Sequence, residues 1–505
     1  MLDVPSFADL NLGVTLPAVF LGVFTTFLLL IDLFIPRKIV TAWLALGALG
    51  VSFFINLFTF DSGETALHGM FVADAFTGFM NLIILTTAIL GVLLSIDYLK
   101  RTGMEKGEYY SLLLFSTAGM MFMASANDLI VIFVALELLS IPLYVMSAFR
   151  PNDVKSEESG MKYFVLGAFA SAFFVYGAAL IYGATGTTSL PEIAQQVTTI
   201  TNLDNSIFYL LVGTALIVVG LGFKVAVVPF HMWTPDVYEG APTPVTAFMS
   251  VGAKAGGFAA LFRIMVVALP AFIISDGDTA TAWQTTVWIV AAVTLILGNF
   301  VAVSQTSIKR MLAYSSIAHA GYLMMAVAAA GANNFELADR ASQAALVYML
   351  AYAFTNIGAF GIAMSLEKDD GTVVTLEDFV GLAKSRPLMA AMMAVFMFSL
   401  TGIPLTGGFV GKWLVFQSTI DANLIPLAVI GVLTSVVSAF YYVRIIVNMY
   451  LRGEGDEGNP AEGATMYVNW AVYACFAGTV LLGIFPTLAT NLTDMVSIAS
   501  RLPLP

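Results

Sequence analysis

The feature that most constrains this chain is the repetition of long apolar segments from one end to the other. A helix of about 20 apolar residues crosses the ~30 Å hydrocarbon core of a bilayer. Segments of about this length fall near 14–35, 39–58, 70–95, 109–125, 128–148, 161–184, 206–229, 243–269, 283–304, 311–331, 341–365, 388–418, 424–450 and 467–489. Since lipid offers the backbone no hydrogen-bond partners, they predict an all-α polytopic membrane protein with about 14 transmembrane helices.

The composition supports lipid as the surrounding solvent. Of the 505 residues, 59% are hydrophobic and only 11% are charged, whereas soluble domains carry roughly 25% charged residues. The net charge of -12 does not suggest nucleic acid as a partner. No basic region precedes the first apolar segment, so we interpret it as a true span and not as a cleaved signal peptide.

Residues that bind redox cofactors are scarce. Cys475 is the single cysteine, and an iron–sulfur cluster needs several thiolates. Of the histidines His68, His231 and His319, only His319 lies well inside an apolar segment, which argues against a bis-histidine haem. The sequence contains neither a Walker loop nor a dinucleotide-binding glycine motif. We therefore expect no cofactor in this chain, and if the protein takes part in redox chemistry, we expect the electrons to be handled elsewhere.

Lysine and arginine residues in the connections predict the orientation, because cytoplasmic loops are enriched in them. With the N-terminus outside, the outer connections hold only Arg340 and Arg501. The inner connections then hold Arg37, Lys38, Lys100, Arg101, Lys106, Arg150, Lys155, Lys309, Arg310, Lys368, Lys384, Arg386, Arg444 and Arg452. This asymmetry favours both termini on the outer, periplasmic side and an even number of spans.

Two spans contain helix breaks, one at Val228-Pro229-Phe230 and one from Gly402 to Gly408. Proline removes a helical hydrogen bond and glycine weakens a helix, although both are common in membrane helices. Paired breaks, each with a lysine nearby, indicate the inverted repeats of a transporter. The predicted organisation is an N-terminal three-helix segment (1–108), two antiporter-like five-helix repeats, each with a broken helix (109–269 and 283–450), and a C-terminal transmembrane helix (451–505).

Ionisable residues deep inside the spans are the candidate functional residues, because such residues are costly in lipid. Glu137 lies about nine residues, or roughly 14 Å, from one end of its span. Lys254 is equally deep, and its small neighbours allow another helix to approach closely. Lys224 and Lys412 each lie near a helix break. Burial and a nearby carboxylate act oppositely on a lysine, so a Glu–Lys pair that opens and closes can switch its protonation.

Each of these residues also has a structural interpretation. Glu137, Lys224 and Lys254 can form buried structural pairs, although intramembrane charges more often mark function. Lys162 lies at the inner end of its span, where it either snorkels to water or takes part in function. His319 is either a proton carrier or a hydrogen-bonded packing residue. Arg263 lies near the outer end of its span, and we expect it to be a snorkelling anchor.

A motif after the seventh span resembles a known family. It consists of His231, Trp233, Pro235, Asp236, Tyr238, Gly240, Ala241, Pro242 and Thr243 at fixed spacing. Together with Leu136–Tyr144 and Ser315–Tyr322, it is similar to the antiporter-like membrane subunits of respiratory complex I and of the multi-subunit cation/proton antiporters. The resemblance covers essentially the whole chain.

Within this family, the segment Gly402–Lys412 is similar to that of the N-type subunits of NADH-quinone oxidoreductase. Subunit M typically carries a glutamate where Lys412 stands, and subunit L is longer, with a lateral helix. The resemblance implies a proton-translocating, non-redox subunit in a bacterial inner (plasma) membrane, with Lys412 as the terminal proton carrier. It implies subunit M, subunit K and the lateral helix of subunit L as partners, together with membrane lipids.

The resemblance implies further roles. Glu137 would pair with Lys224 as a switch, and Lys162 would modulate that pair. Lys254, with His319 nearby, would bridge two half-channels, driven by quinone reduction in neighbouring subunits. Two alternatives stay open: a subunit of a multi-subunit cation/proton antiporter, and a scaffold whose deep charges can be neutralised without loss of function.

Overall fold

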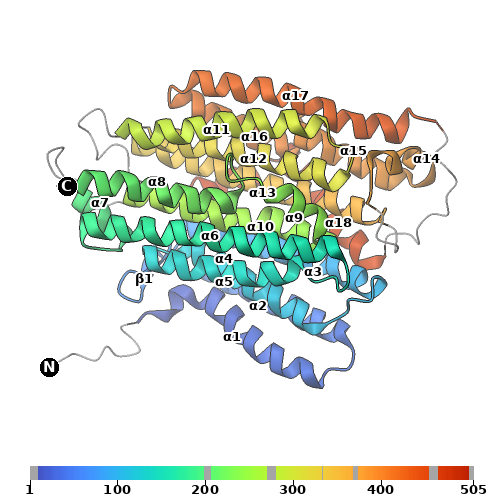
Figure 1. The fold of residues 1–505 in the computed structure, drawn as a ribbon, viewed down its shortest axis with the longest axis horizontal. Coiled ribbons are helices and arrows are strands. Elements are labelled where there is room, and N and C mark those ends of the chain that lie inside the picture. The colour runs from blue at the N-terminus through green and yellow to red at the C-terminus, as the bar shows by residue number, and fades with distance from the viewer. Residues whose placement is uncertain are drawn as a thin grey trace.

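A computed structural model describes residues 10–197, 206–269, 280–332, 334–367, 373–453 and 465–499. In these ranges long helices lie side by side, from α1 at the bottom of Figure 1 to α17 at the top. Lys368 and Arg501, which entered the orientation argument, lie outside the described residues, as do parts of the predicted terminal segments.

The helices that make up the body of the bundle are α1 (Leu16–Ile31), α2 (Lys38–Phe58), α3 (Ala75–Arg101), α4 (Gly107–Ser125), α5 (Leu129–Ser147), α6 (Val154–Thr185), α8 (Ser206–Val225), α10 (Thr243–Phe262), α11 (Ala280–Val303), α12 (Ile308–Ala330), α13 (Phe335–Met364), α15 (Pro387–Thr401), α16 (Gly407–Asp421), α17 (Ile425–Tyr450) and α18 (Met466–Ile484). The short elements are α7 (Leu190–Val197), α9 (Thr234–Gly240), α14 (Leu382–Ser385), α19 (Thr487–Thr493), three 3₁₀ turns (Leu12–Thr15, Asp32–Phe34 and Leu376–Phe379) and a π-helical turn (Arg263–Ala268).

Twelve of the described helical segments are long and apolar enough to cross a membrane, judged by length and composition. They match twelve of the predicted spans. The other two predicted spans, 109–125 and 388–418, correspond to α4 and to the shorter helices α15 and α16. The all-α polytopic fold is therefore confirmed over the described residues, and the count of fourteen spans stays a prediction.

Two boundaries differ from those expected. Two short strands, β1 (Glu64–Ala66) and β2 (Phe71–Ala73), pair antiparallel, so α3 begins only at Ala75 and not near residue 70. Helix α6 begins at Val154, before the predicted start at 161, because its first turns carry charged residues outside the apolar run. Hydropathy finds the apolar part of a helix and misses such polar extensions.

Both predicted helix breaks are confirmed. Helix α8 ends at Val225, and the chain resumes helical structure only at Thr234. The Trp233 Nε1–H donates to the carbonyl oxygen of Phe223 at 3.0 Å, which satisfies a carbonyl at the end of α8. Helix α15 ends at Thr401, followed by the C-cap residue Gly402, whose φ of 92° favours glycine, and α16 begins at Gly407.

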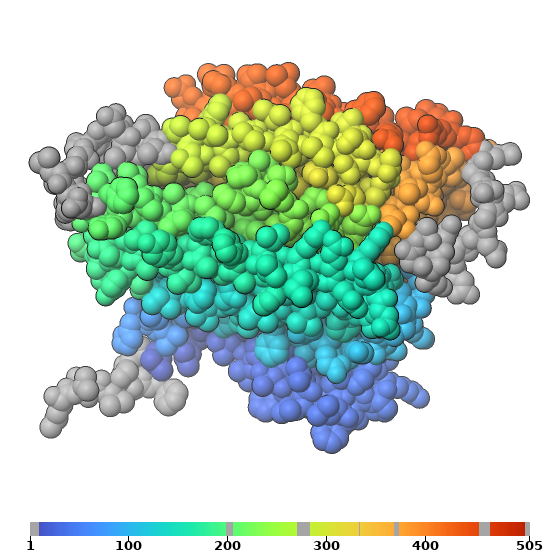
Figure 2. All heavy atoms as spheres, viewed as in Figure 1, coloured from blue at the N-terminus to red at the C-terminus, as the bar shows by residue number. Residues whose placement is uncertain are grey.

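The centre of the bundle consists of α10, α12 and α13. The apolar windows of these helices are 100%, 94% and 89% buried, whereas those of α2, α6 and α17 are between 33% and 39% buried. Small residues allow the central packing: a Cβ at Gly257 would lie 2.8 Å from Cγ1 of Val225 on α8. Figure 2 shows the outer surface passing in bands from α1 and α2 at the bottom to α17 at the top.

Candidate functional site

Lys224 lies in the last turn of α8, immediately before the first helix break. Its side chain is 2% exposed, and its Nζ atom has no hydrogen-bond partner among the described residues. The Nζ atom lies over two tyrosine rings, 5.1 Å from the centroid of Tyr144 and 5.0 Å from that of Tyr163. These rings give the ammonium group a cation–π environment inside the helix bundle.

Glu137 lies on α5, close enough for its charge to act on Lys224. No hydrogen bond reaches its buried Oε1 atom, and no salt bridge joins it to Lys224 in the described part of the chain. The residue is half-buried, between the exposed apolar residues Val134 and Ile141. The predicted acid and base are therefore neighbours that are not bonded to each other in this structure.

Lys254 lies in the middle of the central helix α10 and is 4% exposed. Its ammonium group donates to Oγ of Ser316 at 2.6 Å and also to the carbonyl oxygen of Ser316 on α12. His319 follows on α12 one turn later. The structure therefore brings Lys254 and His319 to the same stretch of α12, joined through the Ser316 turn and not by a direct bond.

Both ring nitrogens of His319 are hydrogen-bonded to tyrosine hydroxyls. Its Nδ1 lies 2.5 Å from the hydroxyl of Tyr348, and its Nε2 lies 3.1 Å from that of Tyr442. The Tyr442 hydroxyl also lies 2.5 Å from Oγ of Ser315. Hydroxyl groups both donate and accept, so this cluster offers a hydrogen-bonded connection between α12, α13 and α17.

Lys412 lies on α16 beside the second helix break, and it is 4% exposed. Its ammonium donates to the carbonyl oxygen of Thr401 at 2.9 Å and to Oγ of Ser435 at 2.9 Å. It also lies 4.8 Å from the ring centroid of Tyr322. The Thr401 carbonyl is at the end of α15, where helix carbonyls lack intrahelical partners and attract cations.

Lys162 belongs to a charged network at the edge of the bundle. Its Nζ lies 2.7 Å from Asp236 and 2.6 Å from Glu158, and Arg310 donates to the same Asp236 at 2.8 Å and to Glu239 at 3.1 Å. Partial burial alone would raise the pKa of Asp236, but the hydrogen bonds from Lys162 and Arg310 lower it below its ordinary value. The predicted influence of Lys162 on the Glu–Lys pair stays a prediction.

Arg263 is not a snorkelling anchor, and that expectation was wrong. Its side chain is 2% exposed and makes two hydrogen bonds of 2.6 Å to the carboxylate of Asp74, the N-cap residue of α3. It also donates to Oγ1 of Thr77 and to the carbonyl oxygen of Ala124. Burial alone would raise the pKa of Asp74, but the charge and hydrogen bonds of Arg263 lower it below its ordinary value. Because the Arg263 guanidinium is paired with a carboxylate at the start of another helix, it does not extend to water.

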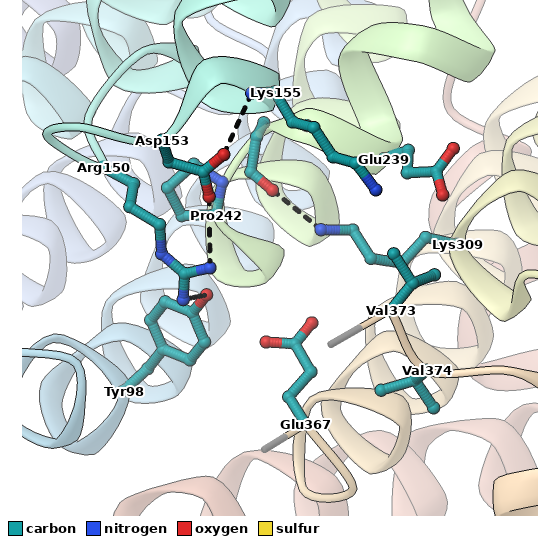
Figure 3. Close-up of a pocket in the computed structure, with 12 residues that line it drawn as sticks. Tyr98, Arg150, Asp153, Lys155, Glu239, Pro242, Lys309, Glu367, Val373 and Val374 are labelled. Carbon is teal, nitrogen blue, oxygen red and sulfur yellow. Dashed lines mark hydrogen bonds and ion pairs between the residues drawn. The ribbon is translucent and has the colours of Figure 1, made fainter. Parts of the chain in front are cut away.

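Charged residues also line a small pocket at one end of the bundle (Figure 3). Lys309 reaches into it and donates to the carbonyl oxygen of Ala241 at 2.7 Å. Arg150 donates to the Tyr98 hydroxyl at 3.3 Å. Arg150 and Lys155 come from one connection and Lys309 from another, and the sequence assigned both connections to the inner side. The structure therefore brings these basic residues to one end of the bundle.

Sequence reasoning missed the residues that hold the lysines. Tyr144, Ser316 and Tyr322 lie in segments that carried the family resemblance but were given no role, and Ser435 was not singled out. The signal available in the sequence was the position of a tyrosine in the middle of an apolar helix, where its hydroxyl needs a partner. Which lysine each tyrosine faces depends on helix packing, which a single sequence does not specify.

Comparison with known proteins finds relatives over nearly the whole chain. Residues 126–438 match the family described as NADH:quinone oxidoreductase/Mrp antiporter, TM. A protein of Trichlorobacter lovleyi named NADH-quinone oxidoreductase subunit N is 45% identical over 484 residues, which cover 95% of this chain and 96% of that protein.

Solved structures agree with this similarity. A chain of respiratory complex I from Thermus thermophilus has a TM-score of 0.78 at 33% identity, covering 95% of this chain and 100% of that one. A chain of the Mrp complex from Dietzia sp. has a TM-score of 0.81 at 22% identity, covering 97% of this chain and 98% of that one. The second likeness shows a shared fold alone.

Proposed function

Because this chain belongs to the NADH-quinone oxidoreductase subunit N family, we propose that it translocates protons as a non-redox membrane subunit of a complex I-type enzyme. Protons move along its buried glutamate, lysine and histidine residues. Quinone reduction in other subunits drives this movement, and no cofactor is assigned to this chain.

The observation that carries the proposal is the burial of three lysines that have no carboxylate partner at salt-bridge distance among the described residues. Lys224, Lys254 and Lys412 are each at most 4% exposed, and the hydrogen-bond partners of the latter two are serine or backbone oxygens. A buried ammonium without a counter-ion is costly in a membrane and most often serves ion or proton transfer.

The proposed path has two ends and a centre. Glu137 and Lys224 form the switch at the first helix break, with Lys162 modulating it. Lys254 and His319 connect the halves through Ser316 and the tyrosine hydroxyls around His319. Lys412 is the terminal carrier at the second break.

The architecture and placement of the subunit are part of the proposal. Residues 109–269 and 283–450 form inverted repeats, an assignment supported by one lysine-bearing helix break in each. The chain lies in a bacterial inner membrane with both termini on the periplasmic side. Its partners are subunits M and K and the lateral helix of subunit L. The exposed apolar residues beside Glu137, 56% to 58% exposed, fit such a neighbour or lipid.

A cation/proton antiporter subunit is the second candidate. The observation that favours it is the fold shared with a chain of the Mrp complex. The 45% identity to a subunit N over 95% of the chain favours the complex I assignment instead.

The test is donor-driven proton uptake by inverted membrane vesicles that contain the whole complex. We expect Lys224→Ala to reduce uptake and quinone-linked turnover by at least about tenfold, because it removes a carrier from the path. The amount of assembled complex and electron transfer to an artificial acceptor should change little. The matched control is Lys106→Ala, which alters an exposed lysine before α4.

Unchanged uptake in an assembled Lys224→Ala complex would contradict the proposed path. Wild-type vesicles that exchange protons for sodium but show no donor-driven uptake would favour the antiporter. Coupling normal in Lys224→Ala, Lys254→Ala and Lys412→Ala alike would favour the scaffold alternative.

A further inference from the structure

Two tyrosines form a cradle around the Lys224 ammonium, and we use this name for Tyr144 and Tyr163. The two rings meet edge to face, with centroids 4.8 Å apart and planes at 85°. Lys224 Nζ lies about equally far from both, at 5.1 Å and 5.0 Å. An ammonium group beside two aromatic faces is attracted by both ring quadrupoles.

Glu137 and Tyr144 lie on the same helix, α5, seven residues apart. Seven residues make about two turns, so both side chains point from the same side of α5, roughly 10 Å apart along its axis. Helix α5 therefore offers Lys224 two neighbouring positions, one at the Glu137 carboxylate and one at the Tyr144 ring. In this structure the ammonium occupies the second.

We propose that Tyr144 is a positioning residue that holds the Lys224 ammonium away from Glu137 through the face of its ring. This inference rests on the proposed function, because it concerns the open state of the proposed Glu137–Lys224 switch. The Glu137 carboxylate and the cradle compete for the Lys224 ammonium. The cradle gives this ammonium a defined position when it is separated from Glu137.

The wall formed by Tyr163 is fixed by the first helix break. Its ring stacks on Trp233 with centroids 4.4 Å apart and planes at 7°. Trp233 is itself held by its hydrogen bond to the Phe223 carbonyl at the end of α8. The helix break thus places the lysine and one wall of its cradle together.

The position of Tyr144 depends on a glycine of the neighbouring helix α6. A Cβ atom at Gly167 would lie 2.1 Å from the Tyr144 hydroxyl oxygen and 2.7 Å from its Cζ. An alanine at 167 would therefore force the Tyr144 ring to move. Gly183, on the same helix, has no atom within 4 Å of such a Cβ and provides a matched control.

Cation–π attraction acts on the charged ammonium and far less on the neutral amine. The ring of Tyr144, and not its hydroxyl, supplies this attraction. A phenylalanine at 144 should therefore preserve the effect, whereas a leucine of comparable bulk should abolish it. A role in hydrogen bonding through the Tyr144 hydroxyl would not produce this order, because phenylalanine lacks that hydroxyl.

The experiment measures donor-driven proton uptake by inverted vesicles, normalised to the amount of assembled complex. We expect Tyr144→Phe to retain uptake within about twofold, and Tyr144→Leu to lose about threefold to tenfold. Gly167→Ala should lose a similar amount, and Gly183→Ala should match the wild type. The double variant Tyr144→Leu/Gly167→Ala should be no worse than either single variant, because both changes remove the same contact.

Equal losses in Tyr144→Phe and Tyr144→Leu would overturn the proposal, because the hydroxyl would then be responsible. Wild-type uptake in Gly167→Ala would also overturn it, and this variant decides the question if Tyr144→Leu does not assemble. Lys224→Ala is measured in parallel. If it abolishes uptake while the Tyr144 and Gly167 variants behave as wild type, the cradle fails and the proposed function stands; if it has no effect, the proposed function fails.

Discussion

Two acid–base pairs inside the bundle are built in opposite ways. Asp74 and Arg263 face each other with two hydrogen bonds of 2.6 Å, and Thr77 and Ala124 satisfy further guanidinium donors. Glu137 and Lys224 are neighbours without a bond, and Lys224 contacts aromatic rings instead. The difference separates a charge pair that fixes helices from one that is free to rearrange.

The locations of the pairs agree with these roles. Asp74 caps α3, and Arg263 begins the π-helical turn after α10, so the closed pair joins two ends of helices. Lys224 lies at a helix break beside the half-buried Glu137. A fully satisfied ion pair has one stable geometry, whereas an unsatisfied pair leaves alternative arrangements close in free energy.

Breaking the closed pair should have the largest effect on stability. Asp74→Asn leaves the Arg263 charge buried without a counter-ion while keeping a side chain that can cap α3. We expect a loss of about 3–5 kcal/mol in stability, seen as little or no assembled complex in the membrane. The measurement is the amount of complex on a native gel, together with its temperature of dissociation.

The double variant Asp74→Asn/Arg263→Met serves as the control. Because it removes the unpaired charge, it should recover part of the lost assembly. Equal assembly of Asp74→Asn and the wild type would show that the pair is not structural, and the comparison with Glu137 and Lys224 would lose its meaning.

Removing the acid of the unbonded pair should affect function and not assembly. Glu137→Gln removes the carboxylate, but Lys224 already has no bond to it, so we expect a stability change below about 1 kcal/mol. Donor-driven proton uptake should fall by at least about tenfold, because the proposed switch would lose its acid. Uptake in vesicles and the same dissociation temperature test both expectations. A fall in assembly as large as that of Asp74→Asn would make this pair structural as well.

The sequence was sufficient to locate the spans and the helix breaks. Apolar length and the prolines and glycines near Pro229 and Gly402 are local properties, so the breaks appear where expected. The depth of Lys224, Lys254 and Lys412 could also be predicted, because position along a span determines depth. All three lysines are buried inside the protein, and their depth in the membrane stays a prediction.

The partners of these residues could not be predicted from one sequence. Arg263 was expected to reach water because it lies near the outer end of its span. Its partner, Asp74, lies 189 positions away and meets it only through the packing of α3 against α10. Tyr144 is similar: its ring faces Lys224 because Gly167 of α6 leaves space for it. Such contacts depend on how helices are rotated against each other.

Of the three carboxylate substitutions, a change at Asp236 should have the smallest effect on stability and on proton uptake. Asp236 and Lys162 are 38% and 39% exposed, so water and salt screen their attraction. We expect Asp236→Asn to change the stability of the complex by at most about 1 kcal/mol, and by less at high salt. Dissociation temperature at low and high ionic strength is the measurement. If Asp236→Asn instead lowers proton uptake as strongly as Glu137→Gln while assembly stays normal, the network belongs to the switch, because Lys162 would then influence Lys224 through Asp236 and the helix break.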